Sequence, residues 1–281
     1  MSKISVIGIA GESVFLSLDE FAKIGETKRI NAIHRELGGK GFNQALAVAK
    51  WGVECSLLCA VNKCDKETYE KIAASAGIKP FFVPKDDESP YAVITTDKCG
   101  KNSVYVYRGC ELNLSDISIF ENEIRTSDLL LINNEVPPEV NEAAVKIAKA
   151  NGVKVILNPA PYRCCDTEFL KSIDLFTPNE HESLGLEEFT NVVVTLGEKG
   201  CEIRDTGEHI PAFEIENALD TTGAGDTFCG VVASCLVNGM SLRTGVKFAC
   251  AAAAIKCSRR YILNSIPTKE ETENFLKERE R

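Results

Sequence analysis

Uninterrupted apolar runs alternate with amphipathic segments along most of the 281-residue chain. Apolar runs of this kind are typical of strands in a parallel sheet whose two faces are covered by helices. The expected strands are 4–9, 53–61, 128–133, 153–159 and 191–197, and the expected helices are 42–52, 66–77, 138–152, 226–239, 241–258 and 268–281. The pattern predicts one α/β domain over 1–281, built on a mostly parallel central sheet.

Two segments, about 12–34 and 91–107, break this rhythm because they have strand chemistry without helices between them. The second contains a hairpin signal with the turn "DKCGKN". We expect a small antiparallel β-sheet that projects from the main domain as a lid. Ordinary extra edge strands are the alternative.

Composition narrows the function. The formal net charge is −9 and the pI about 5.1, so the overall field does not attract nucleic acid or an anionic membrane. No apolar run is long enough to span a bilayer. The 12 cysteines form no C-x-x-C pair and only three histidines are present, which favours reduced core thiols in a cytoplasmic protein. Any phosphate must be bound locally.

The stretch "ALDTTGAGDTFCG" (218–230) predicts such a local site. Gly223, Ala224 and Gly225 lack bulk at the expected start of a helix, where free N–H groups and the helix dipole attract anions. The Lys-Ser or Lys-Thr of a Walker-type loop is absent. Asp226 either caps the helix or accepts a proton from a hydroxyl while the anion hole takes up the charge of a phosphoryl group in transfer.

Two further stretches carry candidate chemistry. "ELGGKGFNQALAVAKWG" (36–52) is neither a Walker loop nor a dinucleotide turn; it is either a tight turn or, through Asn43, a site for sugar hydroxyls. In "DLFTPNEHE" (174–182), Asn179 and Glu182 are either a capping pair or an oxygen-rich site for a hydrated Mg²⁺. Spacing alone leaves both alternatives open.

Taken together, these stretches resemble the ribokinase family of carbohydrate kinases over essentially the whole chain. "GGKGFNQA" and "DTTGAGDTFCG" resemble its two signatures, and "LNPAP", "TPNEHE" and "VVVTLGEKG" lie between them in the family order. The resemblance implies a three-layer α/β core with a β-sheet lid. It also implies transfer of the γ-phosphoryl group of ATP to a hydroxymethyl group of a sugar or related polyol.

The resemblance also implies roles for individual residues. Asp226 matches the catalytic base, and the amides of Gly223, Ala224 and Gly225 match the anion hole. The substrate-binding positions are Gly11, Ser13, Gly39, Lys40, Asn43 and Glu135 together with Asp226. The nucleotide-binding positions are Asn179, Thr195, Gly197, Gly200 and Gly225. Mg²⁺ would be held, through water, by Glu182 and Asn179, and a monovalent cation, usually K⁺, by Asp220, Thr222 and Ser265.

The chain departs from the family pattern at two places. Gly11 and Ser13 stand where ribokinases have an Asn-x-Asp element that grips sugar hydroxyls, and a site without those hydrogen bonds discriminates differently between acceptors. Tyr261 stands where ribokinases usually have Gly, which predicts a cost if that position has a positive φ. The acceptor and the K⁺ site are therefore both open.

Three alternatives frame the kinase hypothesis. A nucleoside kinase is compatible with loss of the Asn-x-Asp pair. A non-catalytic sugar- or nucleotide-binding regulator is disfavoured by retention of Asp226 and the glycines. A dehydrogenase is disfavoured because no dinucleotide turn follows the first strand. We also expect a homodimer through the lid, with no nucleic acid or membrane as partner.

Overall fold

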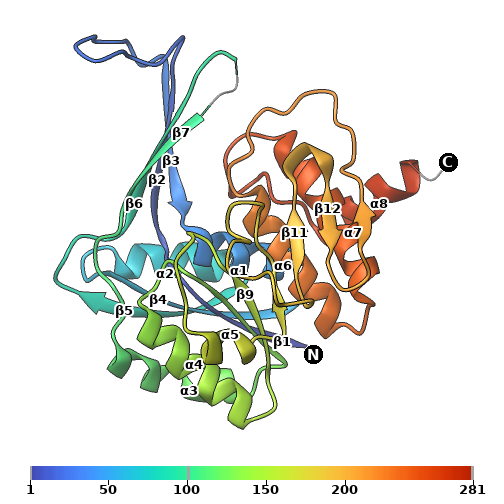
Figure 1. Ribbon diagram of the computed structural model, residues 1–281. Helices are drawn as coiled ribbons and strands as arrows, with labels where there is room; N and C mark the ends of the chain where they lie inside the picture. Colours follow the sequence, from blue (N-terminus) through green and yellow to red (C-terminus); the bar gives the residue numbers. More distant parts are fainter. Residues whose placement is uncertain (1, 100–101, 280–281) are drawn as a thin grey trace.

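The structure is a computed structural model that describes residues 2–99 and 102–279 (Figure 1). Its centre is a six-stranded sheet with the order β10-β9-β8-β1-β4-β5, in which every neighbouring pair is parallel. The strands are β1 (Lys3–Ile7), β4 (Glu54–Asn62), β5 (Ile78–Lys85), β8 (Leu129–Asn133), β9 (Lys154–Asn158) and β10 (Leu175–Phe176). The predicted parallel sheet is confirmed.

Alternate side chains of these strands enter two separate cores, one on each face of the sheet. In β4, Leu57 joins one core and Leu58 the other, and Leu131 and Ile132 of β8 divide in the same way. Successive strand residues point to opposite faces, so a strand with both faces covered must be apolar at every position. This explains the uninterrupted apolar runs of the sequence.

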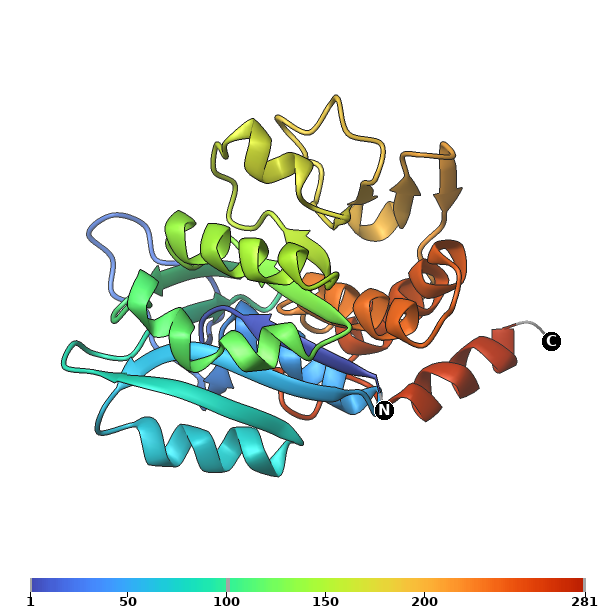
Figure 2. The same cartoon turned by 90° about the horizontal axis from the view of Figure 1, so that it is seen from below.

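Helices cover both faces of the sheet and complete three layers. One layer contains α1 (Lys40–Lys50), α2 (Lys66–Ser75), α6 (Ala224–Val237) and α7 (Leu242–Cys257), and the other contains α3 (Glu121–Arg125) and α4 (Pro138–Ala150). The orange α6 and α7 pack side by side, with α1 against α6 (Figure 2). The C-terminal α8 (Lys269–Arg279) packs on α7. No helix in the described ranges is both long and apolar enough to cross a bilayer.

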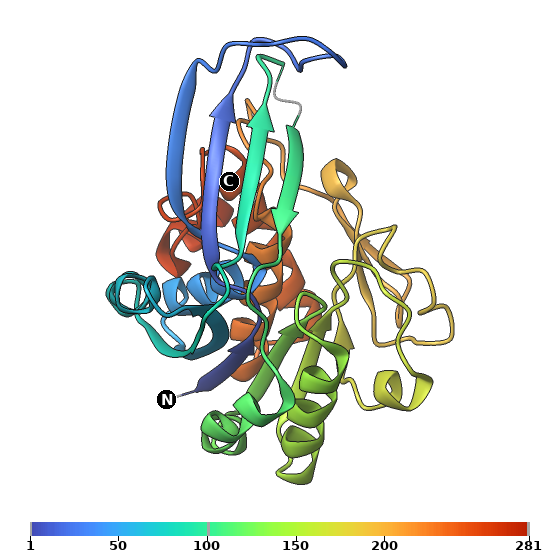
Figure 3. The ribbon, with the colours of Figure 1, turned by 90° about the vertical axis from the view of Figure 1, so that its left-hand side faces the viewer.

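The predicted lid is a four-stranded sheet that rises from one end of the molecule (Figure 3). Its order is β3-β2-β6-β7, with bounds β2 (Gly11–Ser17), β3 (Ala32–Gly38), β6 (Tyr91–Thr96) and β7 (Asn102–Tyr107). The expected antiparallel pairing holds for β2 with β3 and for β6 with β7, but β2 and β6 are parallel. The lid is therefore a mixed sheet. Part of the predicted "DKCGKN" turn, residues 100–101, lies outside the described residues.

A third, antiparallel sheet of three strands follows β10. It consists of β11 (Val193–Thr195), β12 (Cys201–Ile203) and β13 (Glu208–Ile210), with the 3₁₀ turn η2 (Gly197–Lys199) between the first two. The predicted strand 191–197 thus belongs to this sheet. Two short elements complete the fold, the 3₁₀ helix η1 (Leu114–Ile119) and the helix α5 (Thr167–Lys171).

Candidate active site

The predicted anion hole lies at the start of α6. Gly223 is the N-cap residue and has φ +75°, a left-handed conformation that glycine adopts without strain. The N–H of Ala224 donates to the carbonyl of Thr221 at 3.2 Å. A Cβ added to Gly225 would have no described atom within 4 Å. The first turn of α6 therefore faces open space at Gly225, as a site for a ligand at a helix N-terminus requires.

The Asp226 carboxylate is in the first turn of α6 and is only 6% exposed. Its Oδ2 accepts a hydrogen bond from the Asn43 amide at 2.8 Å, and its Oδ1 lies 3.5 Å from Nε2 of Gln44. The Asn43 Oδ1 is buried and finds no hydrogen-bond partner within the described ranges. Because buried amide oxygens normally have a donor, this oxygen is suited to accept a hydrogen bond from a bound hydroxyl.

A buried polar network around Gln44 positions Asp226 and Asn43. Gln44 accepts from the Asn133 amide at 3.2 Å and donates to Oδ1 of Asn158 at 3.3 Å. The two asparagines end the apolar strands β8 and β9. Asp226 therefore connects through Gln44 to the carboxyl ends of the central strands, where ligands bind in open α/β sheets.

The glycine cluster before α1 serves close packing. A Cβ on Gly41 would lie 2.7 Å from the backbone of Gly8, and one on Gly39 would lie 2.6 Å from the carbonyl oxygen of Ile9. Gly39 is also the N-cap residue of α1 and has φ +96°. The N-terminus of α1 thus packs directly on the turn after β1, which brings Asn43 and Gln44 under Asp226.

Glu135 and Lys40 lie on the same side of the site. The Lys40 N–H donates to Oε2 of Glu135 at 3.1 Å. The negative charge of Asp226 raises the pKa of Lys40, against the effect of burial, and Glu135 adds to the rise. Burial raises the pKa of Glu135 to about 7, although Lys40 opposes this. The predicted substrate-binding residues Lys40, Asn43 and Glu135 are therefore gathered around Asp226.

The two residues that replace the Asn-x-Asp element are both packed into the base of the lid. Gly11 cannot carry a side chain, because a Cβ there would lie 1.9 Å from the carbonyl oxygen of Pro90. Ser13 is buried, and its hydroxyl oxygen would be 2.2 Å from a Cβ on Gly38. The same Cβ would be 3.8 Å from the Asn43 Oδ1. Of the two, only Ser13 has a polar side chain, and it lies on the side of Gly38 that faces Asn43.

Asn179 and Glu182 form a reciprocal pair in the loop after β10. The Glu182 N–H donates to the Asn179 Oδ1 at 2.8 Å, and the Asn179 N–H donates to Oε2 of Glu182 at 3.0 Å. This is capping-box geometry, which the sequence left as one of two alternatives. Within the described ranges, 2–99 and 102–279, no group of three or more His, Cys, Asp or Glu side chains is arranged to hold a metal ion.

The predicted nucleotide-binding turn lies beside this pair. Thr195, at the end of β11, bridges to Asn179 in parallel register, and its hydroxyl donates to the carbonyl of Pro178 at 3.3 Å. Gly197 and Gly200 both have positive φ, +59° and +98°. A Cβ on Gly200 would lie 2.1 Å from the carbonyl oxygen of Ile210, so this position admits only glycine.

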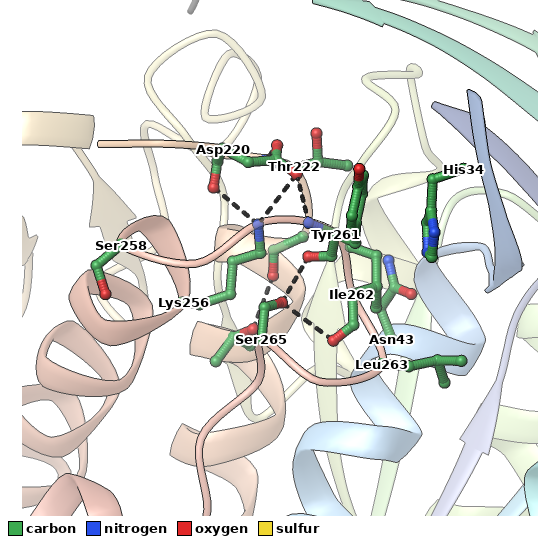
Figure 4. A network of polar contacts seen from close by, with 12 residues as sticks. His34, Asn43, Asp220, Thr222, Lys256, Ser258, Tyr261, Ile262, Leu263 and Ser265 are labelled. Carbon is green, nitrogen blue, oxygen red and sulfur yellow. Dashed lines mark hydrogen bonds and ion pairs between the residues drawn. The ribbon is translucent and has the colours of Figure 1, made fainter. Parts of the chain in front are cut away.

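The predicted monovalent-cation residues are gathered in one network, shown in Figure 4. The Asp220 carboxylate accepts from the N–H of Thr222 at 2.9 Å and from the N–H of Tyr261 at 3.0 Å. The Ser265 hydroxyl donates to the carbonyl oxygens of Tyr261 and Ile262, at 2.5 and 3.0 Å. The ammonium of Lys256, which the sequence analysis did not single out, lies in the same network. Its Nζ donates to the Asp220 carbonyl oxygen at 2.7 Å.

Tyr261 has φ +68°, so the condition under which the sequence predicts a cost is met, and it is the one non-glycine residue with positive φ among those described. A left-handed non-glycine residue costs about 1–3 kcal/mol and persists where its surroundings hold it. Here its ring stacks on His34 with a centroid distance of 3.8 Å and meets Phe15 edge-on at 5.2 Å. Both partners are in the lid. The lid also provides Glu36, whose carboxylate accepts from the N–H groups of Ile262 and Leu263.

Several site residues were missed from the sequence, and each had a weak signal. Gln44 lies within the quoted "GFNQA" motif, and Asn133 and Asn158 are polar residues that end buried apolar strands. Lys256 follows the apolar run "ACAAAAI", in a mostly buried part of α7, where a charged residue is rare unless it is paired. Attention to polar residues in apolar surroundings would have found all four.

Comparison with known proteins agrees with this geometry. The family model described as pfkB family carbohydrate kinase matches residues 1–269. Ribokinase of Haemophilus influenzae is 33% identical, over 97% of this chain and 98% of that protein. The crystal structure of Thermotoga maritima ribokinase superposes with a TM-score of 0.84 at 32% identity, over 99% of this chain and 100% of that one. Arabidopsis thaliana ribokinase complexed with ribose and ATP has a TM-score of 0.82 at 26% identity, over 99% of both chains.

These matches confirm the predicted three-layer α/β fold and the predicted kinase class. They extend over the lid, the central sheet and the C-terminal helices alike, since they cover nearly the whole chain. The chain therefore belongs to the pfkB family of carbohydrate kinases, in its ribokinase-like part.

Proposed function

We propose that this protein transfers the γ-phosphoryl group of ATP to a hydroxymethyl group of a sugar, with Asp226 as general base. One observation carries the proposal. A buried carboxylate, oriented by the Asn43 amide, lies in the first turn of a helix whose Gly225 faces open space. A base and an anion site are thereby placed side by side, as phosphoryl transfer to a hydroxyl requires.

In this proposal the acceptor hydroxyl lies between Asn43 and Asp226. Asp226 takes the hydroxyl proton as the new bond from oxygen to phosphorus forms and the bond to the β-phosphate oxygen of ATP breaks. The N–H groups of Gly223 and Gly225 stabilise the negative charge on the phosphoryl oxygens, and that of Ala224 joins them only when it leaves the carbonyl of Thr221. Closure of the lid keeps out water, which would otherwise act as acceptor.

The nucleotide would lie along Thr195, Gly197 and Gly200, the turn next to Asn179. Mg²⁺ neutralises phosphate charge in such reactions. Because Asn179 Oδ1 and one Glu182 oxygen already accept each other's N–H groups, this pair suits contact with Mg²⁺ through water. The raised pKa of Lys40 keeps a cation among Asp226, Glu135 and Glu182, so the three carboxylates do not repel the phosphates unopposed.

The search for the acceptor should include D-ribose and other compounds. The chain lacks both sugar-gripping side chains that it is expected to have by resemblance to ribokinases: Gly11 has no room for any side chain, and only the Ser13 hydroxyl stands at the second position. That observation is compatible with a nucleoside, which is the second candidate acceptor. A regulator without activity is the third reading, and the ordered Asp226–Asn43 pair argues against it.

The test is an ADP-release assay with a panel of pentoses, hexoses and nucleosides. Asp226→Asn is expected to lower turnover by about 10²–10⁴-fold, the usual contribution of a general base, while ATP binding by calorimetry is retained. The exposed Asp205→Asn is the matched control and should behave as wild type. Near-normal turnover of Asp226→Asn would contradict the assignment of the base, and binding without turnover of every acceptor would favour the regulator.

We also propose a homodimer through the lid. The edge strand β7 is exposed on both faces, and large apolar side chains gather on it; the most exposed are Val104, Tyr105, Val106 and Tyr107. An exposed apolar edge strand invites pairing with another chain. Sedimentation is expected to show a dimer that Tyr105→Glu separates and Leu184→Ser, an exposed site outside the lid, does not. A wild-type monomer would contradict this. The predicted cytoplasmic location stays a prediction.

A further inference from the structure

Lys256 is a buried cation that the proposed mechanism does not use. It is the second-to-last residue of α7, and its side chain is 0% exposed. Its Nζ donates to the Asp220 carbonyl oxygen at 2.7 Å and lies 3.7 Å from Oδ2 of the same residue. Figure 4 shows this ammonium beside the turn of Asp220 and Thr222, near the loop that contains Tyr261 and Ser265. Buried lysines are rare, so this one calls for a physical explanation.

The residues predicted to bind K⁺ do not fit a metal ion in this chain. Proteins hold K⁺ with carbonyl and carboxylate oxygens that replace its hydration shell. Here both carboxylate oxygens of Asp220 accept backbone N–H groups, and its carbonyl oxygen accepts the Lys256 ammonium. The Ser265 hydroxyl has donated its hydrogen to two carbonyl oxygens of the same loop. Protein donors thus already bind all three Asp220 oxygens. The oxygens left open among the predicted ligands are the Ser265 hydroxyl and the Thr222 Oγ1, which is buried without a hydrogen-bond partner in the described ranges, and two oxygens are too few to replace a hydration shell.

We propose that the Lys256 ammonium takes the place of the monovalent cation, so that this kinase carries its own cation beside the anion hole and does not require K⁺. An ammonium has one positive charge and three donors for oxygen acceptors, which suits it to the same carbonyl and carboxylate environment. The inference goes beyond the proposed function, because it concerns ion dependence and not the reaction or its acceptor.

The position of the charge explains why a cation is needed there. Asp220 is three residues before Gly223, the N-cap of α6. Its carboxylate, which is 10% exposed, would by itself repel a phosphoryl group at that helix end. Lys256 offsets this charge and, through the Asp220 carbonyl, holds the turn that leads into Gly223. Burial lowers the pKa of Lys256, and the Asp220 carboxylate opposes this by favouring the charged form.

The experiment compares K⁺, Na⁺ and tetramethylammonium chlorides at constant ionic strength, which keeps screening equal. The wild-type protein is expected to show the same ADP-release rate within about twofold in the three salts. Its melting temperature is expected to be the same in all three, since an ion bound only to the folded state would raise it. Stimulation or stabilisation of the wild type by K⁺ alone would overturn the proposal. The melting series needs no acceptor, so it decides even where the proposed reaction fails.

Two variants sharpen the test. Lys256→Ala removes the charge and leaves space at the Asp220 oxygens, so turnover should fall by about tenfold or more and be restored in part by K⁺ and not by tetramethylammonium. Its melting temperature should rise selectively in K⁺. Lys256→Met is the matched control, because it removes the charge but fills the space, and K⁺ should not rescue it.

A purely structural lysine would give a different result, because its removal would lower stability equally in every salt. Lys256→Ala with wild-type turnover in all three salts, or with losses that K⁺ does not reverse, would count against the proposal. Where neither variant folds, the wild-type salt series still decides between an ion-independent and a K⁺-dependent protein.

Discussion

Two helices of the site, α1 and α6, both begin at a glycine with positive φ. The glycines of α1 allow close backbone packing, whereas Gly225 of α6 leaves space open. At α1, a Cβ on Gly39 or Gly41 would meet backbone atoms at 2.6 and 2.7 Å. At α6, a Cβ on Gly225 would have no described atom within 4 Å. The first cluster brings two pieces of backbone together, whereas the second keeps space free at a helix end.

The difference separates two meanings of a glycine-rich motif. In the sequence, "GGKG" and "TGAG" look alike, and both suggest close approach of something to the backbone. At α1 the approaching group is the chain itself, the turn after β1. At α6 nothing described fills the place beside Gly225, in the first turn of the helix, where N–H groups lack partners within the helix. Only the second is a direct candidate for phosphate binding.

The largest expected effect is loss of stability in Gly41→Ala. The added methyl would lie 2.7 Å from both the Cα and the carbonyl carbon of Gly8, and backbone on that side cannot move without disturbing β1. We expect a loss of about 3 kcal/mol or more in the free energy of unfolding, measured by urea denaturation. Gly225→Ala is the matched control. Equal stability of the two variants would remove the distinction between the clusters.

Gly225→Ala is expected to change activity instead. A methyl in the interior of a helix turn is tolerated, and alanine is favoured over glycine there by up to about 1 kcal/mol. The same methyl would occupy the space proposed for the phosphoryl group. We expect kcat/KM for ATP to fall by about tenfold to a hundredfold with an unchanged or slightly higher melting temperature. Unchanged kinetics would show that this open space is not the phosphate site.

The smallest expected effect is a pH dependence of the KM for the acceptor, which arises from Glu135 beside the start of α1. Burial raises the pKa of Glu135 to about 7, so the carboxylate that we propose accepts from a sugar hydroxyl forms as the pH rises through that value. The KM for the acceptor should therefore fall by a few-fold between about pH 6 and pH 8. Glu135→Gln, which has no titration, should flatten the profile.

Stability gives a second measure of the same group. The folded-state pKa of Glu135 is raised above its ordinary value, so between about pH 4.5 and pH 7 the unfolded chain binds fewer protons than the folded chain. The contribution of Glu135 to stability therefore falls as the pH rises through this window, and the fall should be absent in Glu135→Gln. Identical stability profiles of the two proteins would indicate that Glu135 has an ordinary pKa.

The sequence predicts the core of this fold well because burial on two faces leaves a plain pattern. Prediction from the sequence fails where contacts between residues distant in the chain determine the structure. Strand β5 was not among the expected strands. It contains Pro80 and Pro84, which a central strand would not accommodate and which are tolerated because β5 is an edge strand. The parallel pairing of β2 with β6 joins segments that are distant in the sequence, and local alternation contains no information about it.

The residues of the candidate site also fall into two groups, those that the sequence identifies and those that only the packing of the chain brings together. Asp226, Asn43 and the glycines are recognisable because their chemistry is local and their motifs are contiguous. Lys256 and Asp220 are 36 residues apart, and only the packing of α7 against α6 brings them together. Tyr261 is intermediate, since its substitution for glycine raised the question of a positive φ but gave no sign of the stack on His34 that holds it.

The contacts of Tyr261 also tie the lid to the phosphate side of the site. His34 and Glu36, both on β3, hold residues 261–263, and a Cβ on Gly223 would lie only 2.8 Å from the side chain of Ile262. In the proposed reaction, an acceptor that draws the lid down would also order the loop against the start of α6. By thermodynamic linkage, we then expect acceptor and nucleotide to strengthen each other's binding by the same factor.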